Sequence, residues 1–339
     1  MALGKNLAAL KEVMITEIFM KILLESLEAR IDDRIFPQFL KKSIVMTDII
    51  PFDQRDGYIW YNGEFVEWKN AKVHVLNHGL HYASCVFEGE RVYNKKIFKS
   101  NEHSQRLHKS AEIIGFKVPF SVEQLNAAKE AAVAKQNITD GYVRAFAWRG
   151  SEKMAISAQH NKIHVAIACW AWPPYYSKEA REAGLKLKFA RYKRPSPETA
   201  PVAAKAAGLY MICTISKHEA ESAGYNDALM LDYRGYLAEA TGANLFLVMK
   251  NGELHTPLPD CFLNGITRLT VIDLAKKRGI KVVERHIMPE ELSDAVDAFL
   301  TGSAAEITRI GSIEDKFKYP KISQMTLDLM QDYHNLVRS

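Results

Sequence analysis

The stretch Ala200-Pro201-Val202-Ala203-Ala204-Lys205-Ala206-Ala207-Gly208-Leu209-Tyr210 places one cation, Lys205, among small and apolar residues. Removal from water disfavours an ammonium ion, so a lysine in such surroundings can be a neutral amine near pH 7. A neutral lysine amine is the nucleophile that forms Schiff bases with aldehydes. The same residues also fit an alanine-rich helix whose lysine reaches into water. Taken alone, the stretch favours this second interpretation, and the choice depends on the rest of the chain.

An acid follows Lys205 after 34 positions, in Glu239-Ala240-Thr241-Gly242-Ala243-Asn244-Leu245-Phe246. A hairpin turn at Arg234-Gly235 and an apolar strand after Asn244 place this acid at the end of a strand, beside a loop of small residues that a flat ring can approach closely. A pyridine nitrogen needs an anionic partner to remain protonated, and the protonated ring is the electron sink of pyridoxal chemistry. The alternative is an ordinary loop glutamate in a weak surface ion pair.

Two further loops are suited to an anion. Asn264-Gly265-Ile266-Thr267-Arg268 leads into a helix, where backbone amides and the Thr267 hydroxyl fit a phosphate dianion. Thr301-Gly302-Ser303-Ala304-Ala305-Glu306 follows a strand, and its amides could bind phosphate or carboxylate. Arg106 could clamp a phosphate with two hydrogen bonds, or it could be a solvated helix residue. Each signal is weak alone, because serine and threonine at helix starts are common.

Other kinds of site find less support. His74, His78 and His81 form H-x3-H-x2-H, which resembles a zinc-binding cluster, but no acid or cysteine nearby completes it, and we expect no metal. The chain contains no phosphate-binding P-loop, no dinucleotide fingerprint after a strand and no G-x-S-x-G nucleophile motif.

The composition is that of an ordinary globular protein of about two domains. The 339 residues carry 45 basic and 40 acidic side chains, a net charge of +5, which argues against a nucleic-acid partner. Four scattered cysteines suggest a reducing compartment. No apolar run is long enough to cross a membrane, and residues 13–27 include three charges, so they predict an amphipathic helix rather than a signal peptide. We therefore expect a cytoplasmic protein.

The hydrophobic pattern predicts a mixed fold with three parts. Residues 1–45 form an N-terminal helical extension, which we expect to be dispensable, since translation could also start at Met46. Residues 46–171 form a smaller α+β domain, residues 172–178 with two prolines form the connection, and residues 179–339 form a larger cofactor-binding domain of barrel-like or mixed α/β character.

Individual elements are predicted by their periodicity and turn residues. We expect hairpins over 58–66 and 91–98, further strands at 72–75, 142–148, 163–168, 227–231, 243–249, 281–284 and 298–300, and helices at 101–114, 121–136, 205–223 and 267–278, with a helix start at 293–295. Ser121 and Gln124 resemble a capping box, and Gly279 is the expected helix terminator.

Together these segments resemble the class IV, fold type IV pyridoxal-phosphate enzymes, specifically the branched-chain amino-acid aminotransferases. The resemblance runs from about Tyr58 to the C-terminal region and is specific because of the order and spacing of its motifs. These are residues 78–82 (HGLHY), 86–93 (VFEGERVY), 103–107 (HSQRL), 203–205 (AAK), 239–246 (EATGANLF), 265–268 (GITR) and 302–306 (GSAAE).

The resemblance implies a role for each matching residue. Lys205 would bind pyridoxal 5'-phosphate as a Schiff base, Glu239 would pair with the ring nitrogen and Tyr210 with the phenolic oxygen. The phosphate would be held by Arg106, Ser303 and the amides of Ile266 and Thr267. Positions that match the substrate pocket of the family are Tyr82, Phe87, Tyr142, Arg144, Trp172, Tyr175, Ser303 and Ala304, with the last two offering amides to the substrate carboxylate.

The implied reaction is transamination of L-leucine, L-isoleucine and L-valine with 2-oxoglutarate by a homodimer or a higher homo-oligomer, as in branched-chain amino-acid biosynthesis. The closest rivals are other class IV enzymes: a D-amino-acid aminotransferase, an aminodeoxychorismate lyase or an amine transaminase. A non-catalytic cofactor- or metal-binding protein is a rival of another kind. Two residues depart from many relatives: Ala243 replaces a second acid, and Ser303 stands where threonine is common.

Overall fold

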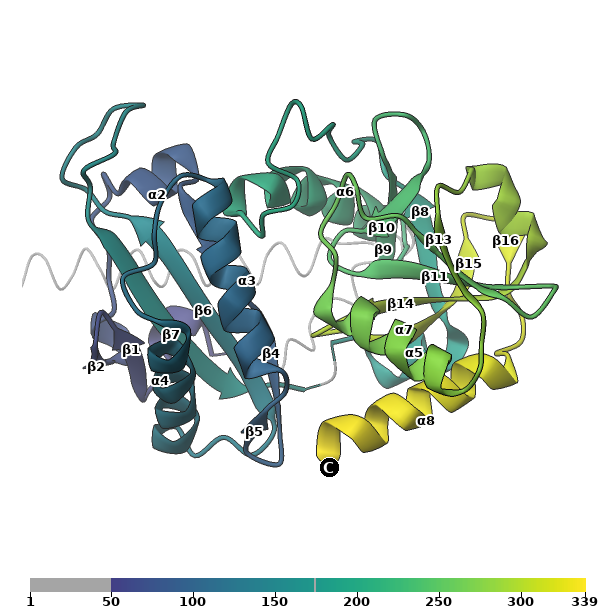
Figure 1. Ribbon diagram of the computed structural model, residues 1–339, viewed down its shortest axis with the longest axis horizontal. Coiled ribbons are helices and arrows are strands. Elements are labelled where there is room, and N and C mark those ends of the chain that lie inside the picture. Colours follow the sequence, from purple (N-terminus) through teal and green to yellow (C-terminus); the bar gives the residue numbers. More distant parts are fainter. Residues whose placement is uncertain (1–49, 174) are drawn as a thin grey trace, which may run out of the picture. The chain divides into compact units, whose positions relative to one another are not determined.

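The computed structural model describes residues 50–173 and 175–339. The expected helical extension over residues 1–45 therefore lies outside the described residues. Residues 53–339 form one compact unit that contains two β-sheets with helices packed on them (Figure 1). None of the described helices is long and apolar enough to cross a membrane.

The first sheet has seven strands, all paired antiparallel, in the order β2-β1-β7-β6-β4-β5, with β3 paired to β6. The strands are β1 (Tyr58–Tyr61), β2 (Glu64–Glu67), β3 (Cys85–Phe87), β4 (Glu90–Tyr93), β5 (Lys96–Ile97), β6 (Gly141–Arg149) and β7 (Ile163–Ala171). Three short helices accompany them: η2 (Phe52–Gln54), η3 (Trp68–Asn70) and α2 (His78–Tyr82).

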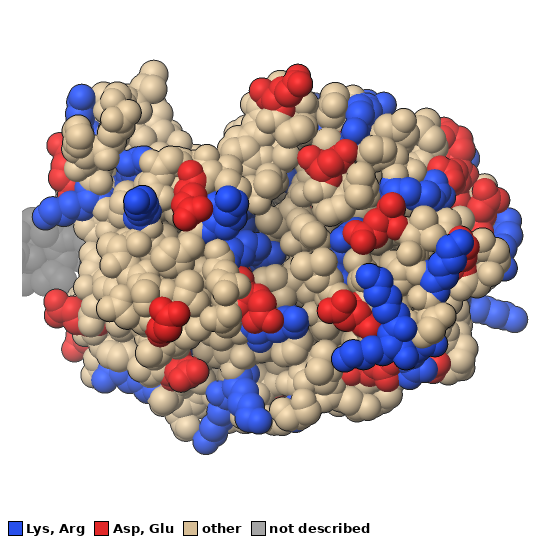
Figure 2. Space-filling model, in the orientation of Figure 1, with Lys and Arg blue, Asp and Glu red and all other residues tan. Residues whose placement is uncertain are grey.

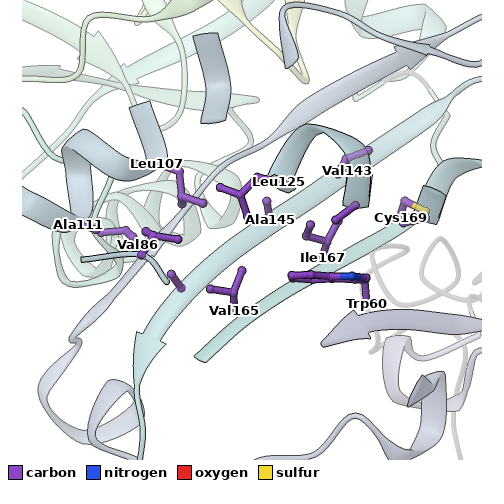
Figure 3. Close-up of a cluster of buried hydrophobic side chains, with 14 of the residues drawn as sticks. Trp60, Val86, Leu107, Ala111, Leu125, Val143, Ala145, Val165, Ile167 and Cys169 are labelled. Carbon is purple, nitrogen blue, oxygen red and sulfur yellow. The ribbon is translucent and has the colours of Figure 1, made fainter. Parts of the chain in front are cut away.

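Two long helices, α3 (Ser100–Ile113) and α4 (Val122–Lys135), cover one face of this sheet (Figure 1). Leu107 of α3 and Leu125 of α4 pack against Val143, Ala145 and other apolar side chains of β6 and β7 (Figure 3). Burial of such side chains contributes roughly 1.5–3 kcal/mol each, so this layer provides much of the free energy that holds the helices on the sheet.

Local signals in the sequence account for these elements. Asn62 and Gly63 both have positive φ, 51° and 108°, which the two-residue turn between β1 and β2 requires. The predicted capping box is confirmed, because the Ser121 hydroxyl accepts from the Gln124 amide and the Gln124 side chain accepts from the Ser121 amide. Both predicted hairpins of this sheet are confirmed.

The second sheet has nine strands, and six of them close into a barrel. The order is β10-β9-β8-β15-β14-β11-β12-β13, β16 pairs with β15, and the barrel closes because β10 also pairs with β11. The strands are β8 (Leu185–Phe189), β9 (Asp227–Leu231), β10 (Leu237–Ala240), β11 (Asn244–Met249), β12 (Leu254–Pro257), β13 (Val282–Arg285), β14 (Ala295–Gly302), β15 (Glu306–Ile313) and β16 (Phe317–Lys318). The barrel-like prediction for this half is confirmed.

Alternation along β11 separates the inside of the barrel from its outer layer. Leu245 and Leu247 belong to the cluster inside the barrel, while Phe246 and Val248 belong to a second cluster. This second cluster contains side chains of α7 (Ile266–Lys277) and α8 (Gln324–Arg338), which cover the outer face. Two other helices are α5 (Lys178–Ala183) and α6 (Met211–Ser222), and short 3-10 turns are η4 (Ala207–Tyr210) and η5 (Pro289–Asp294).

Two predicted elements are wrong, and the start of a third differs from the prediction. Residues 72–75 form no strand, and Ala295 begins β14 instead of lying in a helix. Lys205 precedes the helix expected at 205–223: Ala206 pairs with Val86 in an isolated bridge, and the Phe87 amide donates to the Lys205 carbonyl. Pairing with β3 overrides the helix propensity of the alanines, and α6 begins only at Met211. Helix α8 was not predicted.

Acidic and basic side chains are interspersed on the face shown in Figure 2, with no stripe of one sign. This distribution agrees with the small net charge of +5.

Candidate active site

Residues from both sheets and their connecting loops line one cavity. Nine of the residues predicted from the sequence lie in its wall: Arg106, Tyr142, Lys205, Tyr210, Glu239, Ile266, Thr267, Ser303 and Ala304. The cavity therefore gathers segments that are almost 200 positions apart in the sequence. It also brings together the amine, the acid and both anion-binding loops of the sequence analysis.

Lys205 is held by its backbone and presents its amine to this cavity. The Ser110 hydroxyl accepts from the Lys205 amide at 3.0 Å, and the side-chain amine donates to the Tyr210 hydroxyl at 2.8 Å. The amine also lies 4.7 Å from the centre of the Phe87 ring. Burial, reinforced by the positive charge of Arg106, lowers the pKa of Lys205 to about 8. The neutral fraction near neutral pH is therefore larger than for an exposed lysine, and the neutral amine is the form that acts as nucleophile or base.

Glu239 is buried at the end of β10, opposite Asn244 at the start of β11. Asn244 Nδ2 donates to Glu239 Oε2 at 3.1 Å, and Arg194 Nε lies 3.4 Å from Glu239 Oε1. Burial raises the pKa of Glu239 to about 7, although Arg194 and Lys205 oppose the rise. A protonated ring nitrogen would add a second positive partner beside Arg194 and would favour the ionised carboxylate.

Arg194 was missed by the sequence analysis. It lies in the basic run Arg191-Tyr192-Lys193-Arg194, and such runs usually form solvated surfaces. In the structure Arg194 is 4% exposed and lines the cavity, where its Nη1 donates to Cys213 Sγ at 3.3 Å. Only the folding of the chain distinguishes this arginine from its exposed neighbours.

Arg106 reaches the cavity from α3 and is fixed by Glu88. Its Nε and Nη2 donate to the two Glu88 oxygens at 2.7 and 2.8 Å, and His103 Nδ1 lies 2.6 Å from Glu88 Oε2. Burial alone would raise the pKa of Glu88, but Arg106 and His103 hold it well below its usual range. Glu88 was quoted only as part of a motif, and its contact with Arg106 could not be read from the sequence.

The amino end of α7 lies in the cavity wall and has no side-chain cap. The amides of Ile266 and Thr267, in the first turn, have no acceptor within the helix and suit an anion. Gly265 donates its amide to Asn244 Oδ1 at 3.2 Å, and a Cβ at Gly265 would lie 2.2 Å from that oxygen. The close approach requires glycine at this position.

The turn between β14 and β15 supplies Ser303 and Ala304. It lies against the turn between β10 and β11, because a Cβ at Gly302 would come within 3.3 Å of the Gly242 carbonyl oxygen. The two small-residue turns therefore form one continuous part of the wall.

Five predicted substrate residues do not line the cavity: Tyr82, Phe87, Arg144, Trp172 and Tyr175. Three of them contact residues that do line it. Phe87 packs edge-on against Tyr210 at 4.8 Å, Trp172 stacks on Tyr142 at 4.9 Å, and Arg144 Nη2 lies 3.5 Å from the Tyr142 hydroxyl. Tyr82 and Tyr175 are 46% and 45% exposed.

The histidine triplet is not assembled as a ligand group. His78 Nε2 contacts the Ala155 carbonyl, and His81 Nε2 contacts the Val75 carbonyl. Within residues 50–173 and 175–339, the one group close enough to share a metal ion is Asp232, Asp260 and Cys261. Arg234 Nη2 donates to all three, so a guanidinium already occupies the position that a cation would take.

The arrangement defines a class of enzyme. An amine with a lowered pKa, a buried carboxylate and an uncapped helix with an arginine fit the aldehyde, ring nitrogen and phosphate of a pyridoxal cofactor. The family model described as amino-transferase class IV matches residues 85–313, and the chain belongs to this family.

Individual relatives are more specific. The chain is 40% identical over 288 residues to the branched-chain-amino-acid aminotransferase of Pseudomonas aeruginosa, covering 84% of this chain and 94% of the relative. It is 45% identical over 257 residues to a probable branched-chain-amino-acid aminotransferase of Rickettsia bellii, covering 76% and 87%. Its structure is similar to that of the Escherichia coli branched-chain amino acid aminotransferase, with a TM-score of 0.80, 38% identity and coverage of 84% and 95%.

Proposed function

We propose that this chain catalyses pyridoxal-phosphate-dependent transfer of the amino group of L-leucine, L-isoleucine and L-valine to 2-oxoglutarate. The observation that carries the proposal is the Lys205 amine, 2.8 Å from the Tyr210 hydroxyl, in a cavity that also contains the buried carboxylate of Glu239. The names of the relatives support the branched-chain assignment. A solved aminotransferase with 35% identity and a TM-score of 0.80 was crystallised with pyridoxamine 5'-phosphate.

Each part of the cofactor has a residue suited to it. Lys205 would hold the aldehyde carbon, Glu239 the ring nitrogen and Tyr210 the phenolic oxygen. Arg106, Ser303 and the amides of Ile266 and Thr267 would hold the phosphate. When bound, pyridoxal phosphate supplies an electron sink that stabilises negative charge at the substrate α-carbon.

The protein contributes proton transfer and orientation. The Lys205 amine would accept the α-proton of the substrate and later return a proton as an acid, and a pKa of about 8 suits both tasks near neutral pH. Tyr210 holds the amine in place at 2.8 Å. Arg194 and Asn244 keep Glu239 oriented, so that the carboxylate ionises when a cationic partner arrives.

The substrate side is aromatic and carries one cation. Tyr142 and Trp172 stack at 4.9 Å, which offers apolar surface for a branched side chain. The Arg144 guanidinium lies 4.6 Å from the centre of the Phe87 ring and close to the Tyr142 hydroxyl, where it could pair with the side-chain carboxylate of glutamate or 2-oxoglutarate.

The test is a panel of L- and D-amino donors with 2-oxoglutarate, monitored for glutamate. Preference for L-leucine, L-isoleucine and L-valine supports the proposal, whereas preference for D-amino acids or amines indicates another class IV activity. A wild-type protein that transfers no amino group, yet shows a cofactor absorbance band that disappears in Lys205→Ala, would be a non-catalytic binding protein.

A homodimer is part of the proposal, with Tyr82 completing the site of the partner subunit. Tyr82 does not line the cavity of its own chain, and near it Val75 and Leu80 are 72% and 69% exposed. Mixing Lys205→Ala with Tyr82→Ala protomers creates one site with both residues intact if Tyr82 acts across the dimer. The mixture should therefore be more active than either variant alone. A monomeric mass of the protein, or a mixture with no more activity than the variants, would contradict the proposal.

We also propose a cytoplasmic location. The four cysteines, all described, are free thiols, as a reducing compartment favours. Cell fractionation with an antibody to the enzyme tests this location.

A further inference from the structure

Asp227, the first residue of β9, joins three segments that are distant in the sequence. The carboxylate is 2% exposed. Its Oδ1 accepts from the Thr241 hydroxyl at 2.6 Å and its Oδ2 accepts from the Tyr176 hydroxyl at 2.9 Å. Lys217 Nζ lies 3.3 Å from Oδ2 and balances the buried charge. None of these four residues was singled out in the sequence.

One of the hydroxyls belongs to the cavity wall. Thr241 lies in the turn between β10 and β11, two positions after Glu239, and it lines the cavity. The turn is closed by the Ala240 amide, which donates to the Ala243 carbonyl at 2.8 Å. The bond to Asp227 therefore fixes the turn that follows the acid expected to bind the ring nitrogen.

The other hydroxyl belongs to an aromatic series that returns to the cavity. Tyr176 packs edge-on against Tyr175 at 4.8 Å, and Tyr175 is parallel to Trp172 at 6.5 Å. Trp172 in turn stacks on Tyr142, which lines the cavity. A continuous path of contacts thus runs from Thr241 through Asp227 to Tyr142.

We propose that Asp227 is a positioning residue that holds the turn containing Thr241 against the aromatic series ending at Tyr176, and so couples the cofactor side of the cavity to its substrate side. The inference rests on the proposed function, which assigns the two sides. An ionised carboxylate can accept from both hydroxyls at once, whereas an amide offers one oxygen and a competing donor. Only an acid satisfies both partners in this geometry.

The coupling predicts an effect on substrate binding that exceeds the effect on chemistry. In Thr241→Val and in Tyr176→Phe, the KM for L-leucine should rise about three- to tenfold with a smaller change in kcat, since each variant breaks the same connection between the two sides of the pocket. Because both hydroxyls act through one carboxylate, the double variant should raise KM no further than the more affected single variant.

Two further measurements separate positioning from stability. The first is the binding of 4-methylvaleric acid to the holoenzyme, followed by tryptophan fluorescence, which requires no turnover. Its dissociation constant should rise in parallel with KM. Tyr319→Phe is the matched control, because Tyr319 is 2% exposed and its hydroxyl donates to the Leu292 carbonyl at 2.9 Å, outside the cavity wall. It should lower the melting temperature without changing KM.

The outcomes are distinct. If Thr241→Val and Tyr176→Phe behave like Tyr319→Phe, or if their effects on KM multiply in the double variant, the coupling through Asp227 is overturned. A wild-type enzyme that neither binds 4-methylvaleric acid nor transfers from L-leucine overturns the proposed function instead, and the coupling with it.

Discussion

The behaviour of Lys205 depends on its surroundings more than on its own chemistry. An exposed lysine keeps its proton to about pH 10.4. Burial and Arg106 lower the pKa of Lys205 to about 8. The fold explains why the residues around Lys205 are small: Ala206 pairs with β3 and leaves room for the amine to reach the cavity.

The lowered pKa has a consequence for stability. Below pH 8 the folded apoenzyme contains a partly buried ammonium, and between pH 8 and 10.5 the folded state loses this proton before the unfolded chain does. Lys205→Met should therefore stabilise the cofactor-free protein by about 1–3 kcal/mol at pH 7, with a gain that shrinks as the pH rises toward 10.5. Melting temperatures at a series of pH values check this. A gain that is independent of pH would contradict it.

Arg144 carries the second prediction at this scale. Arg144→Ala should lower kcat/KM for L-glutamate about 10- to 100-fold, because a charge-assisted hydrogen bond to the side-chain carboxylate is lost. Turnover of L-leucine, whose side chain has no charge, should change much less. Steady-state kinetics with both donors decide the matter, and equal losses would remove Arg144 from this role.

The ends of helices and strands, together with the turns that join them, bring several of the expected binding groups to the cavity. The amino end of α7 and the turns after β10 and β14 meet at the cavity, and small residues let them approach one another. Gly265→Ala would bring a Cβ within 2.2 Å of Asn244 Oδ1, and Asn244 also holds Glu239. We expect weaker binding of pyridoxal phosphate and a lower melting temperature.

Gly242→Ala is the matched control for that prediction, because a Cβ there meets nothing within 4 Å. The cofactor-free Gly242→Ala protein should melt like the wild type. Dissociation constants and melting temperatures measured on both variants give the comparison, and equal melting temperatures for the two would disprove the steric argument.

Strand β4 makes a specific contact with the barrel. Tyr93, only 1% exposed, donates its hydroxyl to Glu306 Oε1 at 2.7 Å, and its ring packs in the cluster under α8. Tyr93→Phe keeps the ring and removes the hydrogen bond, which should lower the free energy of unfolding by about 1–2 kcal/mol. Urea denaturation measures the change. No change in the denaturation midpoint would show that the bond contributes nothing net.

At the scale of the whole molecule, every described residue that lines the cavity lies between Gly89 and Ala304. Both sheets lie within residues 58–318. A chain that begins at Met46 should therefore fold with the same melting temperature and retain the aminotransferase activity of the full chain. Loss of folding or activity in this shortened chain would show that residues 1–45 are required. The division of the remainder at residues 172–178 into two domains stays a proposal.

Much of the secondary structure was predictable where local chemistry decides it. The Asn62-Gly63 turn and the cap at Ser121 depend on neighbours within a few positions. The start of the helix expected at Lys205 was wrong, because the bridge between Ala206 and Val86, more than 100 positions earlier, outweighs the helix propensity of alanine there. Helix α8 was missed, although Leu329, Tyr333 and Val337 form a buried face at helical spacing.

The sequence by itself determined the family and predicted which residues would react, because motif order and residue type can be read along the chain. It could not determine which charged side chains meet. Arg194 at Glu239, Glu88 at Arg106 and Asp227 between Thr241 and Tyr176 became visible only in the fold. The physical reason is that the stability of a buried charge and the pKa of its group depend on other groups within a few ångströms. Only folding brings those groups together.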